Sequence, residues 1–205
     1  MGSIWNEQSV KPDQIVLVLD GPLPEGLNNA IENWKSLLGD VLLTIPLNKN
    51  IGLGGALKIG LKECQYDLVA RMDTDDVSTP ERFKKQIEFL KSNDDIDVVG
   101  TFIKEIDEFN NVVKDVVVYP KEQKDLFIFF QKRDPIAHPT AMFRKSYFEK
   151  AGTYSSELLL AEDTLLWYKG FLNHCNFANI DYIGLHFRRE SAFYKRRGGF
   201  KKSYR

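Results

Sequence analysis

The segment YDLVARMDTDDVSTPERF, residues 66–83, contains the junction between two elements. Its first part, YDLVARMD, predicts a buried strand, and TPERFKKQIEFLKSN predicts a helix with Thr79 as N-cap and a proline in the first position. Between them, Asp73, Asp75 and Asp76 gather like charges, which repel one another unless a cation joins them. A strand, an acidic turn and a helix in this order are typical of α/β proteins.

The same alternation runs through the first half of the chain. QIVLVLDGP and VLLTIPL predict buried strands, and LPEGLNNAIENWKSLLG and NIGLGGALKIGLKEC predict helices, the first of them closed by Gly39. DIDVVGTFIKEID and VVKDVVVYP predict a further pair of strands. We therefore expect an α/β fold, a mostly parallel sheet flanked by helices on both faces.

Length and composition predict one globular domain over residues 1–205. Hydrophobic residues make up 43% of the chain, which is enough for a single core. No run of eighteen apolar residues and no signal-peptide pattern occur in the sequence, which predicts a cytoplasmic protein.

Charge is divided unevenly between the body of the chain and its end. Residues 186–205 carry a net charge of +7, which leaves −8 on the remainder. This basic tail has two interpretations: an anionic partner, such as a phosphate-bearing substrate or an anionic membrane surface, or a solvated chain end. The acidic body argues against a nucleic-acid partner.

Acidic residues follow two of the predicted strands. Asp20 ends the first strand, Asp73 ends the third, and the carboxyl ends of parallel strands border one crevice. The Asp-x-Asp of Asp73 and Asp75 can hold Mg²⁺ or Mn²⁺, with phosphate oxygens and water as further ligands. Alternatively, Asp75 or Asp76 only begins the turn before the helix. The spacing alone leaves both interpretations open.

A second acidic pair, Glu162 and Asp163, opens the segment EDTLLWYKGF. One carboxylate there could serve as a general base, and the alternative is an acidic first turn that favours the helix dipole. His138 precedes a proline in DPIAHPTAMFRKSYFEKAG, where a hydrogen-bonded structural role competes with a role in a site.

Five segments stand in the order, and at about the separations, found in family 2 glycosyltransferases, which this chain resembles. They are PDQIVLVLDGP, NIGLGGALKIGL, ARMDTDDVSTPERF, HPTAMFRKSYFEKAGTY and AEDTLLWYKG. The resemblance covers nearly the whole chain and implies a GT-A fold that binds a nucleotide-diphosphate sugar with Mg²⁺ or Mn²⁺. It implies inverting transfer to a saccharide or lipid-linked acceptor in bacterial cell-surface polysaccharide synthesis, in the cytoplasm or at the inner membrane surface.

The resemblance also implies roles for individual acidic residues. Asp20 contacts the base or ribose of the nucleotide. Asp73 and Asp75 form the metal-binding motif, with Asp75 the direct ligand. Asp163 is the base that removes the acceptor proton, and Glu162 supports the acceptor.

Roles for basic residues follow from the same resemblance. Arg71 contacts the nucleotide, braces the aspartates or only neutralises them. His138 lies below the acceptor and sugar. Arg188, Arg196 and Arg197 are unranked candidates for the diphosphate.

The resemblance departs from the family pattern at the N-terminus, where related sequences begin with a strand before a segment like SIWNEQSVKPDQIV. We expect an N-terminally incomplete domain without that strand. Either IVLVLD pairs directly with LVARMD, or two chains associate as a homodimer, which we favour. The alternative function is a non-catalytic nucleotide- or sugar-binding fragment.

Overall fold

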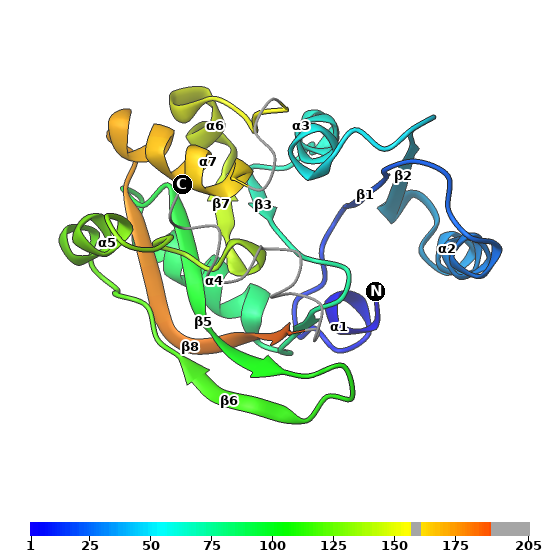
Figure 1. Cartoon of the computed structure of the whole chain (residues 1–205), viewed down its shortest axis with the longest axis horizontal. Helices are drawn as coiled ribbons and strands as arrows, with labels where there is room; N and C mark the ends of the chain where they lie inside the picture. Colours follow the sequence, from blue (N-terminus) through cyan, green and yellow to red (C-terminus); the bar gives the residue numbers. More distant parts are fainter. Residues whose placement is uncertain (157–160, 190–205) are drawn as a thin grey trace, which may run out of the picture.

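The computed structural model describes residues 1–156 and 161–189, which form an α/β arrangement (Figure 1). Its strands are β1 (Ile15–Leu19), β2 (Leu42–Pro46), β3 (Leu68–Ala70), β4 (Val77–Ser78), β5 (Val98–Ile106), β6 (Val112–Val117), β7 (Met142–Arg144) and β8 (Phe177–Arg188). Its α-helices are α1 (Gly2–Trp5), α2 (Glu25–Leu38), α3 (Leu53–Glu63), α4 (Arg82–Ser92), α5 (Gln123–Phe130), α6 (Lys145–Ala151) and α7 (Glu162–Leu172). Short 3-10 turns cover Gly39–Val41 and His138–Thr140.

The elements predicted from periodicity are confirmed, from β1 to the β5–β6 pair. Helix α2 ends where Gly39 adopts a φ of 54°, a conformation that glycine takes without a Cβ penalty. No helix within the described ranges is long and apolar enough to cross a bilayer.

The prediction of Thr79 as an N-cap is wrong. Helix α4 begins two residues later than that prediction implies, with Glu81 in the capping position. The Thr79 hydroxyl instead donates to the carbonyl oxygen of Ile183 at 3.1 Å, and its N–H donates to Gly184. Thr79 therefore continues the pairing of β4 with β8, and this long-range contact overrides the local capping preference.

The larger sheet has the order β3-β7-β5-β8-β4. Strand β6 lies outside this order and pairs with the part of β5 that does not pair with β7. Here the expectation of mostly parallel pairing needs correction. Strand β5 runs parallel to β8, but β3–β7, β5–β7, β4–β8 and β5–β6 are antiparallel. The parallel βαβ pattern predicted for the first half holds for β1 and β2, whereas β7 lies between β3 and β5 and runs antiparallel to both.

Strands β1 and β2 form a separate two-stranded sheet, and β1 does not pair with β3 in the described part of the chain. Direct closure between IVLVLD and LVARMD is therefore contradicted, while association of two chains stays a prediction. Helices join the two sheets instead. Gly60 allows α3 to pack on β1, because a Cβ there would already lie 3.0 Å from Val18, and Leu57 and Leu61 pack into the main core.

Aromatic rings fix α6 and α7 against the larger sheet. Trp167 of α7 is fully buried and stacks on Phe143 of β7, with ring centroids 5.7 Å apart. Tyr147 of α6 donates its hydroxyl to the carbonyl oxygen of Leu166 at 2.9 Å. These contacts set the position of the first turn of α7, where the second acidic pair lies.

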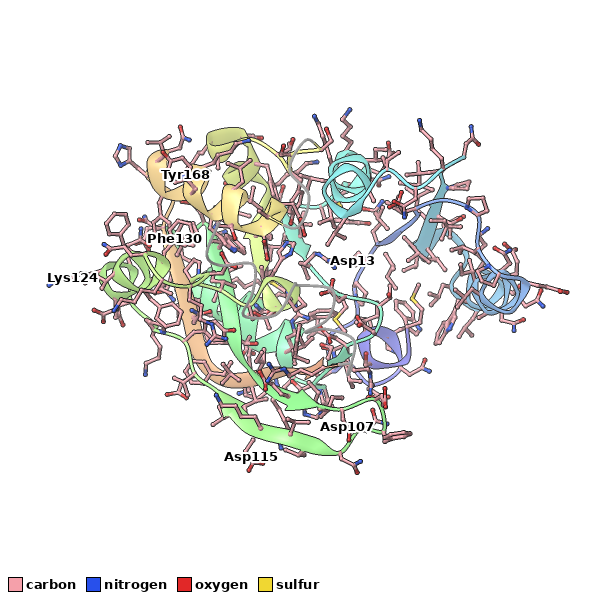
Figure 2. All side chains as sticks on the ribbon, in the orientation of Figure 1. Asp13, Asp107, Asp115, Lys124, Phe130 and Tyr168 are labelled. Atoms are coloured by element: carbon pink, nitrogen blue, oxygen red, sulfur yellow. The ribbon has the colours of Figure 1, made fainter. Side chains whose placement is uncertain are left out.

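The β5–β6 hairpin extends away from this aromatic core. Figure 2 shows Asp107 and Asp115 on this hairpin, on the opposite side of the molecule from Tyr168 of α7. The Asp107 carboxylate accepts N–H groups from Phe109 and Asn111, and it thereby orders the turn between the two strands.

Candidate functional site

The loop between β3 and β4 carries the Asp-x-Asp motif. Arg71 forms an ion pair with Asp73 and also donates to the carbonyl oxygen of Met72. Asp75 is exposed, and its carboxylate has no hydrogen-bonding partner among the residues that the structure describes. Of the two carboxylates, the one on Asp75 is therefore the freer to meet a ligand, and Arg71 holds the other.

A fully buried arginine supports this loop from beneath. Arg82, at the start of α4, donates to the carbonyl oxygen of Arg71 at 2.7 Å and to the side chain of Gln86 at 3.0 Å. Burial lowers the pKa of Arg82 to about 9, an effect that the nearby Asp76 opposes. Arg82 could not be recognised as a site residue from the sequence, because a charged residue in a first helical turn is usually exposed.

Asp76 joins the same loop to β8. One carboxylate oxygen accepts the backbone N–H of Arg188 at 2.7 Å, and the other is buried with no hydrogen-bonding partner among the described residues. Burial raises the pKa of Asp76 to about 7, although the bond from Arg188 acts in the opposite direction. Asp76 therefore has a structural contact in addition to the turn-starting role considered from sequence.

Arg188 lies directly beside the Asp-x-Asp motif. Its Nε donates to the carbonyl oxygen of Asp75 at 2.8 Å, its Nη1 to that of Asp107 at 2.7 Å, and its Nη2 to the side chain of Asn110 at 2.8 Å. The guanidinium thus bridges the motif and the β5–β6 turn. Arg196 and Arg197 lie outside the described residues.

Asp20 follows β1 and fixes the loop that precedes α3. Its two oxygens accept N–H groups from Ile51 at 2.7 Å and from Gly52 at 3.1 Å. Gly52 has a φ of 86°, which favours glycine. A carboxylate can accept further hydrogen bonds through its remaining lone pairs, so this contact leaves capacity for a nucleotide.

The start of α3 lies against the segment that leads into α7. A Cβ on Gly54 would lie 2.1 Å from the carbonyl oxygen of Ser155 and 3.3 Å from the Cβ of Glu162. Only glycine allows this approach. The loop that Asp20 fixes is thereby placed next to the second acidic pair.

Glu162 and Asp163 form the first turn of α7, so the helix-dipole interpretation holds alongside any chemical role. Glu162 is buried, whereas Asp163 is half-buried and accepts the N–H of Thr164 at 2.8 Å. The Thr164 hydroxyl donates to Asp134 at 2.9 Å. Asp163 therefore combines a fixed backbone position with access to solvent.

The buried hydroxyl of Tyr154 is affected by both acidic motifs. Burial raises the pKa of its hydroxyl, and the charges that act on it include those of Arg71, Asp73 and Asp163. Charges from the Asp-x-Asp loop and from the start of α7 therefore both act on the same hydroxyl. Tyr154 was not predicted as a site residue, although it lies at the end of HPTAMFRKSYFEKAGTY, two residues after Gly152.

His138 is buried and its Nε2 hydrogen-bonds the hydroxyl of Tyr154 at 2.9 Å, with Trp167 edge-on at 5.9 Å. Burial, reinforced by the positive charge of Arg71, holds the pKa of His138 well below its ordinary value. A neutral histidine in this position supports Tyr154 from below, as the hydrogen-bonded interpretation requires.

The donors present suit a divalent cation that arrives with its substrate. No group of three or more histidine, cysteine or acidic side chains within residues 1–156 and 161–189 could hold a metal alone. Asp75 offers a carboxylate without a partner among the described residues, and Asp73 offers a neighbouring one that is paired with Arg71. Mg²⁺ or Mn²⁺ commonly takes few protein ligands and completes its shell with phosphate oxygens and water. These residues fit such a cation.

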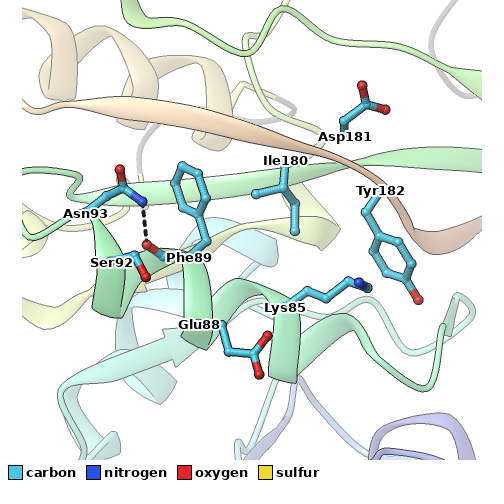
Figure 3. Close-up of a pocket in the computed structure, with 8 residues that line it drawn as sticks. All are labelled: Lys85, Glu88, Phe89, Ser92, Asn93, Ile180, Asp181 and Tyr182. Atoms are coloured by element: carbon cyan, nitrogen blue, oxygen red, sulfur yellow. Dashed lines mark hydrogen bonds between the residues drawn. The ribbon is translucent and has the colours of Figure 1, made fainter.

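A groove on the other side of the sheet contains none of these residues. It has a volume of about 380 Å³ and lies between α4 and β8, where Phe89, Ile180 and Tyr182 form part of its wall (Figure 3). Lys85 lies 5.0 Å from the ring of Tyr182. Its shallow, mixed lining makes it a poorer candidate than the convergence of acidic motifs around Tyr154.

Comparison with known families assigns the chain. The model of the family described as "Glycosyl transferase family 2" matches residues 4–152, which include the Asp-x-Asp loop and His138. The chain belongs to glycosyl transferase family 2. The resemblance seen in the sequence is thereby confirmed.

Two relatives in this family illustrate the similarity. The chain is 34% identical over 197 residues to the UDP-Gal:alpha-D-GlcNAc-diphosphoundecaprenol beta-1,3-galactosyltransferase of Escherichia coli, covering 95% of this chain and 70% of that protein. It is 39% identical over 162 residues to the amylovoran biosynthesis glycosyltransferase AmsE of Erwinia amylovora, covering 79% of this chain and 59% of the relative. The chain therefore spans only part of each relative's length.

Solved structures in the comparison show the fold. The structure of TarS residues 1–349 from S. aureus matches with a TM-score of 0.69 at 20% identity, covering 89% of this chain and 53% of that 1–349 chain. The mannosyltransferase PcManGT from Pyrobaculum calidifontis, in complex with GDP-Man and Mn²⁺, matches with a TM-score of 0.63 at 15% identity, covering 88% of this chain and 50% of PcManGT. The family 2 chain has the GT-A fold.

Proposed function

We propose that this chain is an inverting glycosyltransferase that uses a nucleotide-diphosphate sugar and Mg²⁺ or Mn²⁺ and acts in cell-surface polysaccharide synthesis. The observations that support the proposal are that the charges of Asp73 and Asp163 both act on the buried hydroxyl of Tyr154, and that the start of α3, at the loop fixed by Asp20, approaches Glu162. Membership of family 2 supports the class of reaction.

Each side chain in the site has a defined task in this reaction. The Asp163 carboxylate accepts the proton of the acceptor hydroxyl as the oxygen attacks the anomeric carbon opposite the diphosphate. A new C–O bond forms, the bond from the anomeric carbon to the phosphate oxygen breaks, and the nucleoside diphosphate leaves with that electron pair. One displacement inverts the anomeric configuration.

Donor binding falls to the residues on the β1 and β3 side. Asp20 directs its carboxylate to the loop before α3, where the base or ribose would meet it. Asp75 would hold the cation, which neutralises charge on the diphosphate when bound. Arg71 keeps Asp73 in place, and this agrees with a bracing role.

The relatives guide the choice of substrates. The E. coli relative is named for UDP-galactose and a GlcNAc-diphosphoundecaprenol acceptor, and TarS has been solved in complex with UDP-GlcNAc. We therefore propose a UDP-sugar donor and a lipid-linked saccharide acceptor, which would place the protein at a membrane surface at least transiently.

Thermal denaturation with UDP-galactose, UDP-GlcNAc and GDP-mannose, each with and without Mn²⁺, tests donor binding. A ligand of the native state raises the melting temperature by mass action. We expect a UDP-sugar to do so only with Mn²⁺, and Asp75→Asn to abolish the shift. Asp115→Asn, on the exposed β6, is the matched control and should retain it. Equal shifts for parent and Asp75→Asn would reject the metal assignment.

A further inference from the structure

The exposed sides of α5 and α7 form one apolar surface. Phe127 and Ile128 of α5 are 53% and 52% exposed, and Tyr168 and Leu172 of α7 are 55% and 62% exposed. Phe171 of α7 packs edge-on against Phe127 at 5.5 Å, so the two helices present these side chains next to one another. We call Phe127, Ile128, Tyr168 and Leu172 the α5/α7 surface. Large apolar side chains clustered in this way mark interaction sites, whereas scattered ones do not.

Lysines frame this surface. Lys124 lies one turn before the Phe127–Ile128 pair, Lys132 lies one turn after it, and Lys169 follows Tyr168. In the described part of the chain, none of these lysines is joined to a carboxylate, since the lysines in ion pairs are Lys35, Lys84, Lys104, Lys121 and Lys150.

The acidic residues of this region lie at the border of the exposed stripe. Asp125 is in the first turn of α5 and Glu122 caps it, where negative charge favours the helix dipole. Asp125 is rotated by about 100° around α5 from Lys124, and Lys169 is rotated by the same angle around α7 from Tyr168, so both border the stripe, whereas Ile128 lies nearly above Lys124. The stripe itself therefore carries apolar and cationic groups, on a chain whose body is acidic.

We propose that the α5/α7 surface docks on an anionic lipid bilayer, an inference that rests on the lipid-linked acceptor of the proposed function. Phe127, Ile128 and Leu172 enter the boundary of the acyl chains, and Tyr168 sits at headgroup level. The three lysines, Lys124, Lys132 and Lys169, extend their aliphatic stems along the surface and place their ammonium groups on lipid phosphates.

Helix α7 connects this surface to the candidate base. Asp163 lies in its first turn and Leu172 at its end, which separates them by about 13 Å along the helix axis. Figure 2 shows Tyr168, Phe130 and Lys124 on the same side of the molecule. Docking of one end of α7 would hold Asp163 above the headgroups, where the saccharide of a lipid-linked acceptor projects.

Vesicle co-sedimentation of the full chain tests the proposal. With vesicles of phosphatidylcholine containing one third phosphatidylglycerol, we expect binding that Phe127→Ser combined with Leu172→Ser weakens by about tenfold or more. The matched control replaces two exposed valines of β6, Val113 and Val116, with serine, and it should bind as the parent does. Equal binding by the parent and the α5/α7 variant, or no binding by the parent, overturns the proposal.

The basic residues of 186–205 could also hold the chain on anionic vesicles, so insertion is measured separately. In Phe127→Trp, lipids brominated in the acyl chain should quench the added fluorescence, whereas Val113→Trp should show no added quenching. Unquenched Phe127→Trp on bound vesicles assigns attachment to the basic residues and overturns docking. Concentration-dependent self-association that is lost in the α5/α7 variant, with vesicle binding unchanged, overturns it in favour of a second copy.

Failure of the proposed function gives a different result. Asp163→Asn should bind vesicles as the parent does, because the base does not contribute to the α5/α7 surface. Transfer activity in a protein that does not bind vesicles would reject the docking proposal and leave the proposed function standing.

Discussion

Arg188 donates from its Nε to the carbonyl oxygen of Asp75 at 2.8 Å, so the end of β8 is bonded to the motif proposed to bind the metal. The same guanidinium reaches Asn110 in the β5–β6 turn. A side chain predicted from sequence to meet the diphosphate thus has contacts that fix the backbone of the neighbouring loop. Because of these contacts, two roles of Arg188 can be tested separately: positioning Asp75, and touching the diphosphate directly.

Replacement of Asn110 provides that separation. Asn110 has a φ of 67°, so Asn110→Gly keeps the backbone conformation while it removes one acceptor of Arg188. If Arg188 positions Asp75, the Mn²⁺ concentration for half-maximal activity should rise by about threefold or more, a small free-energy change typical of one hydrogen bond. The measurement is a Mn²⁺ titration of initial rates.

Glu108→Gln, an exposed change in the same turn, is the control and should leave the Mn²⁺ dependence unchanged. An Asn110→Gly protein with the parent's Mn²⁺ dependence, alongside an Arg188→Lys protein that binds nucleotide diphosphate poorly, would favour direct contact of Arg188 with the diphosphate.

Gly54 tests the packing of α3 against the second acidic pair. In Gly54→Ala the new Cβ would meet the carbonyl oxygen of Ser155 at 2.1 Å, so the segment leading to Glu162 must move. We expect kcat/KM to fall by about tenfold or more, because a small displacement of a catalytic group is costly. Gly26→Ala is the control: nothing lies within 4 Å of its Cβ position, in the first turn of α2.

The comparison is made by steady-state kinetics together with thermal denaturation. Gly26→Ala should keep parental activity and gain up to about 1 kcal/mol of stability. Parental kcat/KM in Gly54→Ala would show that the approach of α3 does not set the geometry of the acidic pair.

The buried His138 should make the stability of the fold sensitive to acid. Its pKa in the folded state is held well below the ordinary value by burial, so the folded protein favours the neutral ring. Above the unfolded pKa of about 6.5 both states are neutral and this residue adds no pH dependence. As pH falls below that value, the unfolded state takes up the proton first, and stability is lost progressively.

Urea denaturation at pH values from about 7.5 down to about 5 measures this loss. His138→Gln should reduce the pH dependence over that interval, at the expense of lower stability throughout. His174→Asn, at an exposed position with a φ of 56° that asparagine tolerates, should keep the parent's pH profile. An unchanged slope in His138→Gln would assign the acid sensitivity to other groups.

Much of the fold follows from local pattern, and the site only in part. The helical spacing of apolar residues and the closing glycine placed α2, and the β-branched segments placed β1, β2 and β5. The antiparallel insertion of β7 beside β3 was missed, because β7 pairs residues far apart in the chain and has only a short apolar segment. Thr79 was wrongly predicted to cap a helix for the same reason, because its hydroxyl bonds Ile183, which is distant in the chain.

For the site, acidic residues at strand ends and helix starts were visible in the sequence because their chemistry is distinctive. The residues that hold these acidic side chains and their loops in place were not visible in the sequence. Asp76 meets Arg188 across 112 positions of sequence, and Arg82 lies buried at a position where a charged side chain is usually solvated. Tyr154 gave no charge signal, since its role depends on which groups the fold brings around it.

The central claim is that Asp163 acts as the base in a transfer from a nucleotide sugar, and its replacement by asparagine tests this most directly. Initial rates of UDP release are measured with UDP-galactose, Mn²⁺ and a GlcNAc-diphospholipid acceptor, for the parent, Asp163→Asn and the exposed control Asp115→Asn. We expect Asp163→Asn to lower kcat by about 10²-fold or more with donor KM little changed, while the control matches the parent. Near-parental kcat in Asp163→Asn would contradict the account and place the base elsewhere.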